Sequence, residues 1–447
     1  MNDEMKAYTQ LLEEYFKQQG LHRMVSYVTE ASSEVLSDSR GSVSLITIKY
    51  ADPEQRINTK RFISRGYTAQ KYDNYDDAKI RSEVSTFRVL SDAFRKMGFN
   101  ALPAVYHSTG EGRNTVFYMQ YVGDYTLAEL YPVMSPAEWA LEEILAHNGP
   151  VVESSIDQNV LLTLEANNRV ERIRNQERMG TYIAVKEKFA RRAAERKKQG
   201  MGIAPTELEL RKDLRAAFGL VTEFQRRLLL WKEQGMYDCS QVLVQNETYL
   251  RDEFEIALSR LAEAPAEIKA RLSVLYSHLF VKRILSTTPM LIHGDCCAHN
   301  IVKGPEGYNE FFIIDTGRIA EGCPLIDAAD FISYCRFFCG MQTDQENEFW
   351  EQELHTTGVS DKEMRHIVSV SREIRIAGAL KNRIKIAEST PNTFLALKLK
   401  GMRRRLPAYE NSLRQFFGAG WQTLESVDKI LMQEFSELML KHYLRQA

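Results

Sequence analysis

The spacing of hydrophobic residues predicts strands in the first quarter of the chain and helices in most of the remainder. An opening helix is indicated by apolar residues at helical spacing, Tyr8, Leu11, Leu12, Tyr15 and Phe16. Runs rich in β-branched and aromatic residues then predict five strands, at about 24–35, 42–50, 60–68, 101–107 and 115–122. A helical pattern through Ile80, Val84, Phe87 and Leu90 separates the third strand from the fourth. We therefore expect residues 1–123 to form a mostly antiparallel five-stranded sheet that carries one helix.

From Gly123 onward the pattern is predominantly helical. Capping boxes, in which Ser or Thr precedes Glu by three residues, predict helix starts at Ser135, Thr206 and Ser360. Long helical patterns at about 155–199 and 207–234, joined by a turn at 200–205, predict a helical hairpin. The predicted class is α+β, with a β-rich first domain (1–123) and a helical second domain (124–447) containing an insert at about 135–288.

One strand-loop-strand segment, residues 289–317, interrupts the helices. Its loop carries His293, Asp295 and Asn300, and its second strand ends in Asp315-Thr-Gly317. One interpretation is a plain β-hairpin that uses Asp and Asn as turn formers. The other is a phosphoryl-transfer site, in which catalysis is mostly positioning plus cations. There Asp295 takes the proton of the acceptor hydroxyl, while Asn300 and Asp315 hold Mg²⁺ between the phosphates.

These motifs resemble those of the protein-kinase-like superfamily, of the aminoglycoside phosphotransferase and choline kinase type. The family's HGDxxxxN and IDxG signatures match His293–Asn300 and Ile314–Gly317, and its "DLA" signature resembles Pro324–Ala329. Upstream, Phe117–Gly123 resembles the fifth strand and hinge. The resemblance covers about residues 24–130 and 289–335. It implies a two-lobed fold that binds ATP or GTP with Mg²⁺.

The resemblance also implies a nucleotide site in the first domain. Arg65 takes the place of the usual third-strand lysine, as arginine does in choline kinases, and its planar fork can clamp phosphate oxygens. Glu83 is similar to the helix glutamate that pairs with this cation. Ile63, on the same face of the strand as Arg65, is expected to cover the adenine, with Met119 at the back of the pocket. Backbone groups near Gln120 and Val122 are expected to hold the purine. Lys60 and Lys71 are other candidates for the phosphate-binding cation, and Arg65 could instead be a solvated strand residue.

Several residues near the loop have alternative interpretations. His293 is expected to support the catalytic loop rather than act as a base, and Asp327 to brace that loop as a buried carboxylate at a helix start. Cys296, Cys297 and His299 could suggest a metal site, but they lack the paired spacing of zinc ligands. The turn at 37–42 has a single glycine, so it is either the nucleotide loop or an ordinary hairpin turn.

Composition and charge narrow the function class. The 447 residues are 44% hydrophobic with a net charge of -2, which argues against a protein built to coat nucleic acid. The sequence shows no membrane span, no signal peptide and no cysteine framework, so a cytoplasmic location is expected. Charge is uneven, with no Lys or Arg at 124–168 and basic runs at 186–198 and 398–405. These segments could simply be solvated faces. Alternatively, the acidic stretch forms a pocket for a cationic acceptor, or the basic runs form docking patches for an anionic partner.

The sequence thus predicts a kinase that transfers the γ-phosphate of ATP or GTP to a hydroxyl group. A small-molecule acceptor, such as an amino-sugar, amino-alcohol or other sugar, is our first hypothesis. A protein acceptor that docks on the enlarged helical region is the second. A non-catalytic nucleotide-binding scaffold is the alternative from a different class. Neither the acceptor's identity nor the oligomeric state follows from the sequence.

Overall fold

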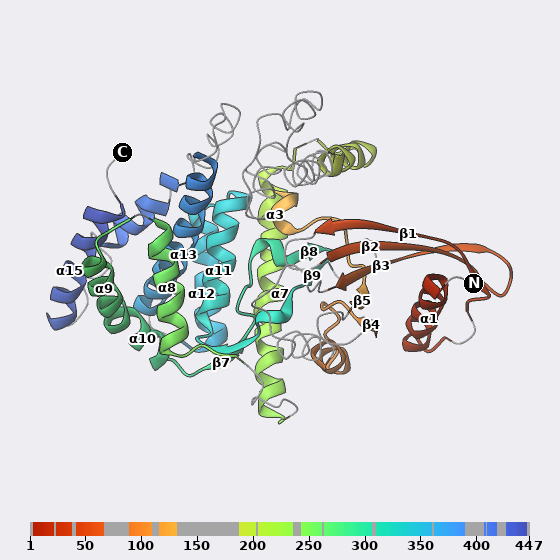
Figure 1. The fold of residues 1–447 in the computed structure, drawn as a ribbon, viewed down its shortest axis with the longest axis horizontal. Helices are drawn as coiled ribbons and strands as arrows, with labels where there is room; N and C mark the ends of the chain where they lie inside the picture. Colours follow the sequence, from red (N-terminus) through yellow and green to blue (C-terminus); the bar gives the residue numbers. More distant parts are fainter. Residues whose placement is uncertain are drawn as a thin grey trace, which may run out of the picture. The chain divides into compact units, whose positions relative to one another are not determined.

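The structure of this chain is a computed structural model. It describes residues 3–21, 24–37, 42–66, 89–109, 116–131, 187–202, 204–235, 243–261, 263–305, 310–359, 362–388, 406–407, 409–417 and 426–444. Two compact units are present (Figure 1). Unit 1 comprises residues 1–126, 227–242 and 299–319, and unit 2 comprises residues 127–226, 243–298 and 320–447.

The predicted antiparallel sheet is confirmed in unit 1. Its five strands are β1 (Tyr27–Ser37), β2 (Ser42–Ala51), β3 (Ile57–Gly66), β4 (Val105–Thr109) and β5 (Val116–Gln120). They run in the order β1-β2-β3-β5-β4, and every neighbouring pair is antiparallel. Side chains along β3 alternate between the two faces because a strand has a period of two residues. Phe62 and Ser64 are buried, whereas Ile63 and Arg65 are only partly buried on the opposite face.

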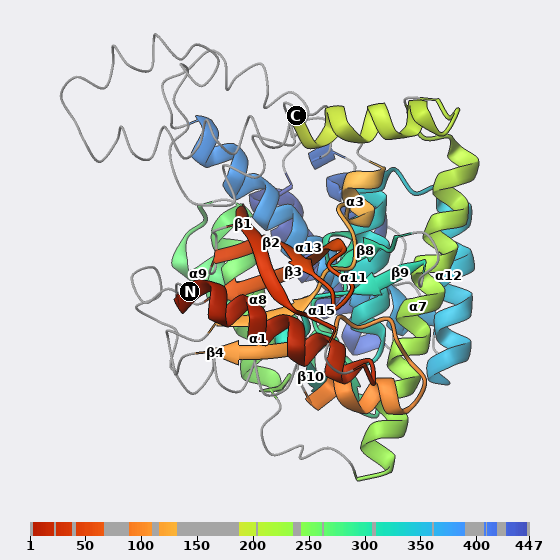
Figure 2. The same cartoon turned by 90° about the vertical axis from the view of Figure 1, so that its right-hand side faces the viewer.

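Helix α1 (Asp3–Gln18) covers one face of this sheet (Figure 2). The helical spacing that predicted it brings Leu11, Leu12 and Phe16 into one hydrophobic cluster with Phe62 and other residues of the sheet. Lys60 also belongs to this side, since its Nζ donates a 2.6 Å hydrogen bond to the hydroxyl of Tyr15 on α1. The face that bears Ile63 and Arg65 is therefore the opposite one.

The helix predicted between β3 and β4 is described only in part, over residues 89–96. Leu90 and Phe94 are fully buried, and the Phe94 ring packs edge-to-face on Trp231. Ile80, Val84 and Phe87, on which that prediction also rested, lie outside the described residues.

The segment 289–317 contains both predicted strands, but they do not pair with each other. The first, β7 (Met290–Ile292), pairs with β10 (Ala320–Gly322), which also pairs with β6 (Leu243–Val244). The second, β9 (Phe311–Ile313), pairs with β8 (Ile301–Lys303), a strand that the sequence pattern did not reveal. The plain hairpin interpretation is wrong for this reason.

Unit 2 is mostly helical, as predicted. Its helices include a segment at 187–198, α3 (Leu127–Leu130), α7 (Glu207–Glu233), α8 (Glu247–Leu261), α9 (Ala266–Tyr276), α10 (Lys282–Ser286), α11 (Leu325–Tyr334), α12 (Thr343–Thr357), α13 (Lys362–Glu388) and α15 (Ser426–His442). The end of α7, from Arg227, belongs to unit 1. Helix α13 contacts both α8 and α11, and α11 also contacts α12.

The capping box at the start of α7 is confirmed. The Glu209 carboxylate accepts a 2.6 Å hydrogen bond from the Thr206 backbone N–H, and the Glu209 N–H donates to the Thr206 hydroxyl at 3.2 Å. Arg196 also pairs with Glu209, and together these contacts hold the Glu209 pKa at about 2. The box at Ser135 and the first residues of the box at Ser360 lie outside the described residues.

The basic run at 186–198 is not simply a solvated face. Lys188 pairs with Glu129 at 2.6 Å, and Arg192 donates to the backbone carbonyls of Glu129 and Leu130. With Arg196, three cations spaced one helical turn apart are therefore engaged within unit 2. Most of the acidic stretch at 124–168 and all of the basic run at 398–405 lie outside the described residues.

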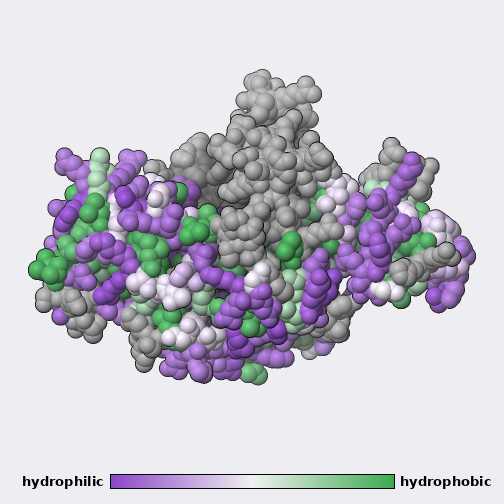
Figure 3. All heavy atoms as spheres, turned by 90° about the horizontal axis from the view of Figure 1, so that it is seen from below, coloured by the Kyte–Doolittle hydropathy of each residue, from purple (hydrophilic) through white to green (hydrophobic). Residues whose placement is uncertain are grey.

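The surface of the described residues is mixed in character. On the face drawn in Figure 3, hydrophobic side chains are scattered among hydrophilic ones. Within the part of the chain that the structure describes, no helix is both long enough and apolar enough to span a membrane.

Candidate phosphotransfer site

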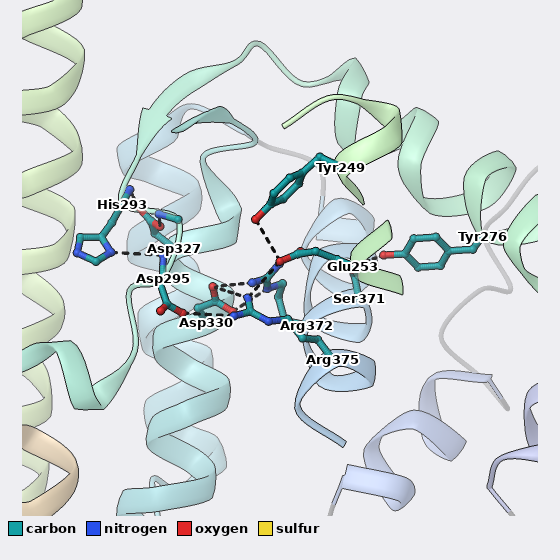
Figure 4. Close-up of polar contacts among 11 residues, drawn as sticks. Tyr249, Glu253, Tyr276, His293, Asp295, Asp327, Asp330, Ser371, Arg372 and Arg375 are labelled. Carbon is teal, nitrogen blue, oxygen red and sulfur yellow. Dashed lines mark hydrogen bonds and ion pairs between the residues drawn. The ribbon is translucent and has the colours of Figure 1, made fainter. Parts of the chain in front are cut away.

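A buried carboxylate holds the backbone of the predicted catalytic loop in unit 2. Asp327, at the start of α11, accepts hydrogen bonds from the N–H groups of His293 at 2.7 Å and Gly294 at 2.9 Å (Figure 4). Burial raises the Asp327 pKa to about 6, while these two donors favour its charged form. Gly294 has a φ of +77°, in the left-handed region that glycine adopts without strain. The expected bracing role of Asp327 is confirmed.

His293, a residue of the same loop, supports it through a buried side chain. Its side chain is fully buried, and its ring lies edge-on to Phe224 of α7. Its Nδ1 lies 3.3 Å from the backbone N–H of Asp295, which donates to it. The imidazole therefore fixes the backbone at the residue that we expect to be the base.

The Asp295 side chain is about one-sixth exposed and faces a guanidinium. Arg375 of α13 donates from Nη2 to Asp295 Oδ1 at 3.3 Å, as drawn in Figure 4. Sequence reasoning missed Arg375. The available signal was the pair Arg372 and Arg375, one turn apart in a helix that is otherwise largely apolar there.

The two predicted metal ligands lie in unit 1, at one end of the β8–β9 hairpin. Ile301 is in register with Ile313, and the carbonyl of Asn300 accepts the N–H of Ile314 at 2.9 Å. Asn300 and Asp315 therefore stand at neighbouring positions where the two strands meet. Asp315 has a φ of +57°, a conformation that costs a non-glycine residue free energy and is found at functional sites.

The donor chemistry at this end of the hairpin fits Mg²⁺. An amide oxygen and a carboxylate are hard ligands, and Mg²⁺ is commonly held by one or two protein groups together with water and substrate phosphates. No cluster of three or more His, Cys, Asp or Glu residues that could hold a metal occurs among the described residues. The alternative site at Cys296 and Cys297 gains no support, because both thiols are buried and burial raises the pKa of Cys296 well above its usual value.

Arg65 reaches the same point from the sheet. Its Nη1 lies 2.9 Å from Asp315 Oδ1, and its side chain is only 19% exposed, so it is not a solvated strand residue. Of the other candidate cations, Lys60 is engaged with Tyr15 near α1, and Lys71 lies outside the described residues. Glu83, the expected partner of Arg65, also lies outside them.

The predicted purine contacts line the sheet near Arg65. Ile63 is in register with Met119 on the adjacent strand. The backbone N–H of Gln120 already donates to Ala104 O at 2.8 Å, so a purine contact there depends instead on the segment around Val122. Val122 is buried in a hydrophobic cluster with other apolar side chains of unit 1, Val302, Phe312 and Ile314.

The segment after β5 runs directly against β8. The N–H of Lys303 donates to Tyr125 O at 3.0 Å. A Cβ on Gly123 would lie 2.1 Å from Lys303 O, and Gly123 has a φ of +148°. Only glycine allows this close approach, which brings the predicted hinge beside the strand that follows Asn300.

In sum, unit 1 contains Arg65, Ile63, Met119, Gln120, Val122, Asn300 and Asp315, and unit 2 contains His293 and Asp295. The set in unit 1 is assembled from segments far apart in the sequence, whereas the two residues of unit 2 belong to one loop. The boundary between the two units falls among the four residues that separate Asp295 from Asn300 in the sequence.

Comparison with known proteins gives structural similarity only. No protein-family model matches the chain, and no curated protein matches it. An aminoglycoside phosphotransferase from Streptomyces rimosus is 12% identical, with a TM-score of 0.38 over 82% of this chain and 98% of that one. The choline kinase LicA from Streptococcus pneumoniae is 9% identical, with a TM-score of 0.38 over 90% of this chain and 100% of that one.

An ethanolamine kinase from Plasmodium vivax is 11% identical, with a TM-score of 0.34 over 86% of this chain and 83% of that one. These similar structures are aminoglycoside phosphotransferases and choline or ethanolamine kinases, all members of the protein-kinase-like superfamily. The TM-scores are below 0.5, so the function has to be inferred from the residues of this chain.

Proposed function

We propose that this chain is a phosphotransferase that moves the γ-phosphate of ATP or GTP, with Mg²⁺, to a hydroxyl group of a small molecule. The observation that carries the proposal is the Arg65–Asp315 pair in unit 1. A guanidinium from β3 and a carboxylate at the end of β9 meet at 2.9 Å. A phosphate-binding cation and a metal ligand must both lie at the nucleotide phosphates, and these two residues lie together.

Within unit 1, Arg65 donates to phosphate oxygens, and its planar fork suits two oxygens at once. Asn300 and Asp315 would hold Mg²⁺, which when bound neutralises charge on the β- and γ-phosphates. Ile63 and Met119 provide apolar surface for the purine, and backbone groups near Val122 hold it.

Within unit 2, Asp295 orients the acceptor hydroxyl and takes its proton as the acceptor oxygen bonds to the γ-phosphorus. The bond from that phosphorus to the β-phosphate oxygen breaks, and the nucleoside diphosphate leaves. General-base work of this kind contributes roughly 10²–10⁴-fold to the rate. Asp327 and His293 fix the loop backbone, and this matters because a misplacement of about 1 Å can cost roughly 10²-fold in rate.

We favour a small-molecule acceptor, such as an amino-sugar, an amino-alcohol or another sugar. A protein acceptor would need a docking surface, and the basic run at 186–198 was the candidate for it. Three of its cations, Lys188, Arg192 and Arg196, are engaged inside unit 2, which leaves less charge for docking.

The test is a transfer screen with γ-labelled ATP and GTP over mixed metabolites, in which wild type is compared with Asp295→Asn. We expect one acceptor class to be labelled, and the variant to lose roughly 10²-fold or more in turnover while nucleotide still raises its melting temperature. Asp252→Asn, an exposed carboxylate on α8, is the matched control. Nucleotide stabilisation of both proteins without transfer to any acceptor would instead identify a non-catalytic scaffold.

A further inference from the structure

Two arginines on α13 connect the candidate base to the surrounding helices of unit 2. Arg372 and Arg375 lie one helical turn apart. Figure 4 shows them beside three carboxylates from different elements: Asp295 of the catalytic loop, Asp330 of α11 and Glu253 of α8.

The Arg372 guanidinium is held by two carboxylates of neighbouring helices. Its Nε and Nη2 donate to the two oxygens of Asp330 at 2.6 and 2.9 Å, and its Nη1 donates to Glu253 at 2.9 Å. Its side chain is 4% exposed, and these carboxylates raise its pKa well above the usual value. Buried arginines held this closely fix the relative positions of the helices that contribute the partners.

Arg375 is held more loosely by the same carboxylates. Its Nη1 lies 3.7 Å from Asp330 and 3.8 Å from Glu253, and this buried nitrogen has no hydrogen-bond partner among the described residues. Within the part of the chain that the structure describes, its one direct hydrogen bond to a carboxylate is the 3.3 Å bond to Asp295. Arg375 therefore bridges the rigid Arg372 network and the candidate base.

The charge count fits a role in catalysis. Three carboxylates facing two guanidiniums leave a single net negative charge. Arg372 pairs closely with Asp330 and Glu253, whereas the shortest contact of Arg375 is the one to Asp295. A base next to an uncompensated pair of carboxylates would be harder to keep ionised.

We propose that Arg375 is a positioning residue, which orients the Asp295 carboxylate for the transfer reaction. This inference rests on the proposed function. Asp327 and His293 contact the backbone of this loop, whereas Arg375 contacts the Asp295 side chain itself. The hydrogen bond from Arg375 fixes that side chain to α8, α11 and α13 through Asp330 and Glu253.

The first test uses MgATP hydrolysis, with water as the acceptor. Arg375→Gln should lower kcat about tenfold and leave the KM for MgATP within about twofold, because positioning acts on the chemical step. Arg375→Lys keeps a cation without the planar fork and should recover part of the loss. Arg365→Gln, ten residues earlier on α13, should match wild type. An unchanged kcat in both Arg375 variants, or a loss seen only as a raised KM, overturns the proposal.

The second test does not depend on activity. The unfolding free energies of wild type, Arg375→Gln, Asp295→Asn and the double variant form a cycle, and the single effects should not add. If they add, the pair contributes nothing and the proposal fails. If wild type hydrolyses no MgATP and transfers no phosphate, the proposed function fails, and the cycle still decides whether the pair exists. If Arg375→Gln does not fold, Arg375→Lys takes its place in both tests, and a kcat equal to that of wild type overturns the role.

Discussion

Arg65 and Asp315 form an ion pair across 250 residues of sequence, with Nη1 2.9 Å from Oδ1. Each is predicted to bind a different part of a nucleotide complex, the arginine a phosphate and the aspartate a cation. Without nucleotide they compensate each other's charge, so neither is left partly buried and unpaired. When a metal-bound triphosphate binds, the Arg65–Asp315 pair would be replaced by two pairs, one between Arg65 and a phosphate and one between Asp315 and the metal ion.

Removal of the arginine should therefore weaken triphosphate binding selectively. We expect Arg65→Ala to lower affinity for ATP about ten- to hundredfold, since hydrogen bonds to charged groups contribute roughly 1.5–3 kcal/mol. Affinity for adenosine should stay the same, because adenosine has no phosphate. Isothermal titration with both ligands measures this difference.

Arg61→Ala is the matched control for that experiment. Arg61 lies four residues before Arg65 on β3, so both side chains point to the same face of the sheet. It is exposed beside Tyr121 and Asp124. It should leave ATP affinity nearly unchanged. Equal losses for ATP and adenosine in Arg65→Ala would show that the residue supports the sheet rather than the phosphates.

A second prediction concerns the metal ligand. Asp315→Asn keeps the shape of the side chain and removes its charge, so Mg²⁺ should no longer enhance the thermal stabilisation by ATP. In wild type the stabilisation with Mg²⁺ should exceed that with ATP and a chelator. Melting curves under both conditions provide the comparison, and an identical Mg²⁺ effect in the two proteins would remove Asp315 from this role.

The sheet was predictable from the sequence because its strands are periodic and separated by turn residues. Phe62 and Arg65, for example, fall on opposite faces as alternation requires. The strand β8 was not predictable, because it has three residues and directly follows Asn300. Its pairing with β9 is nevertheless what places Asn300 beside Asp315.

Residues that act through long-range ion pairs also could not be predicted from the sequence pattern. Arg375 lies 80 residues from Asp295, and only the packing of α13 against α8 and α11 brings them together. In contrast, Asp327 was predictable as a brace because it lies in a recognisable motif at a helix start. A residue within a local motif can be assigned a role from the sequence. An ion pair between residues on separate helices can be found only once the tertiary structure is known.

A third prediction follows from the close approach at Gly123. Gly123→Ala should destabilise the fold by about 2 kcal/mol or more, because its Cβ would overlap the Lys303 carbonyl. Gly98→Ala is the control, since Gly98 also has a positive φ, +77°, but open space around it. Its cost should be limited to roughly 1–2 kcal/mol of backbone strain. Denaturant unfolding of both variants distinguishes the overlap from the strain, and equal costs would contradict it.

A buried carboxyl group on α12 provides the last prediction. Glu353 is fully buried, and neither of its carboxyl oxygens has a hydrogen-bond partner among the described residues. Burial, together with the nearby charge of Asp327, raises its pKa to about 8. Gln225 lies beside it and lowers this pKa in part, but burial outweighs that effect. The Gln225 Oε1 lacks a partner among the described residues, so a protonated Glu353 has an acceptor available.

Because the folded-state pKa is above the usual value for Glu, folding takes up a proton between about pH 4.5 and 8. Stability should therefore fall as pH rises through this window, by up to roughly 1.4 kcal/mol per pH unit for one whole proton. Glu353→Gln has no proton to lose and can donate its amide N–H to Gln225. We expect the variant to lose less stability than wild type between pH 5 and 8, and to be the more stable protein at pH 8. Urea unfolding across this range measures both slopes, with the exposed Glu351→Gln on the same helix as a control for lost charge. Parallel slopes for wild type and Glu353→Gln would show that Glu353 is ionised in the folded protein, in which case an unidentified group compensates its charge.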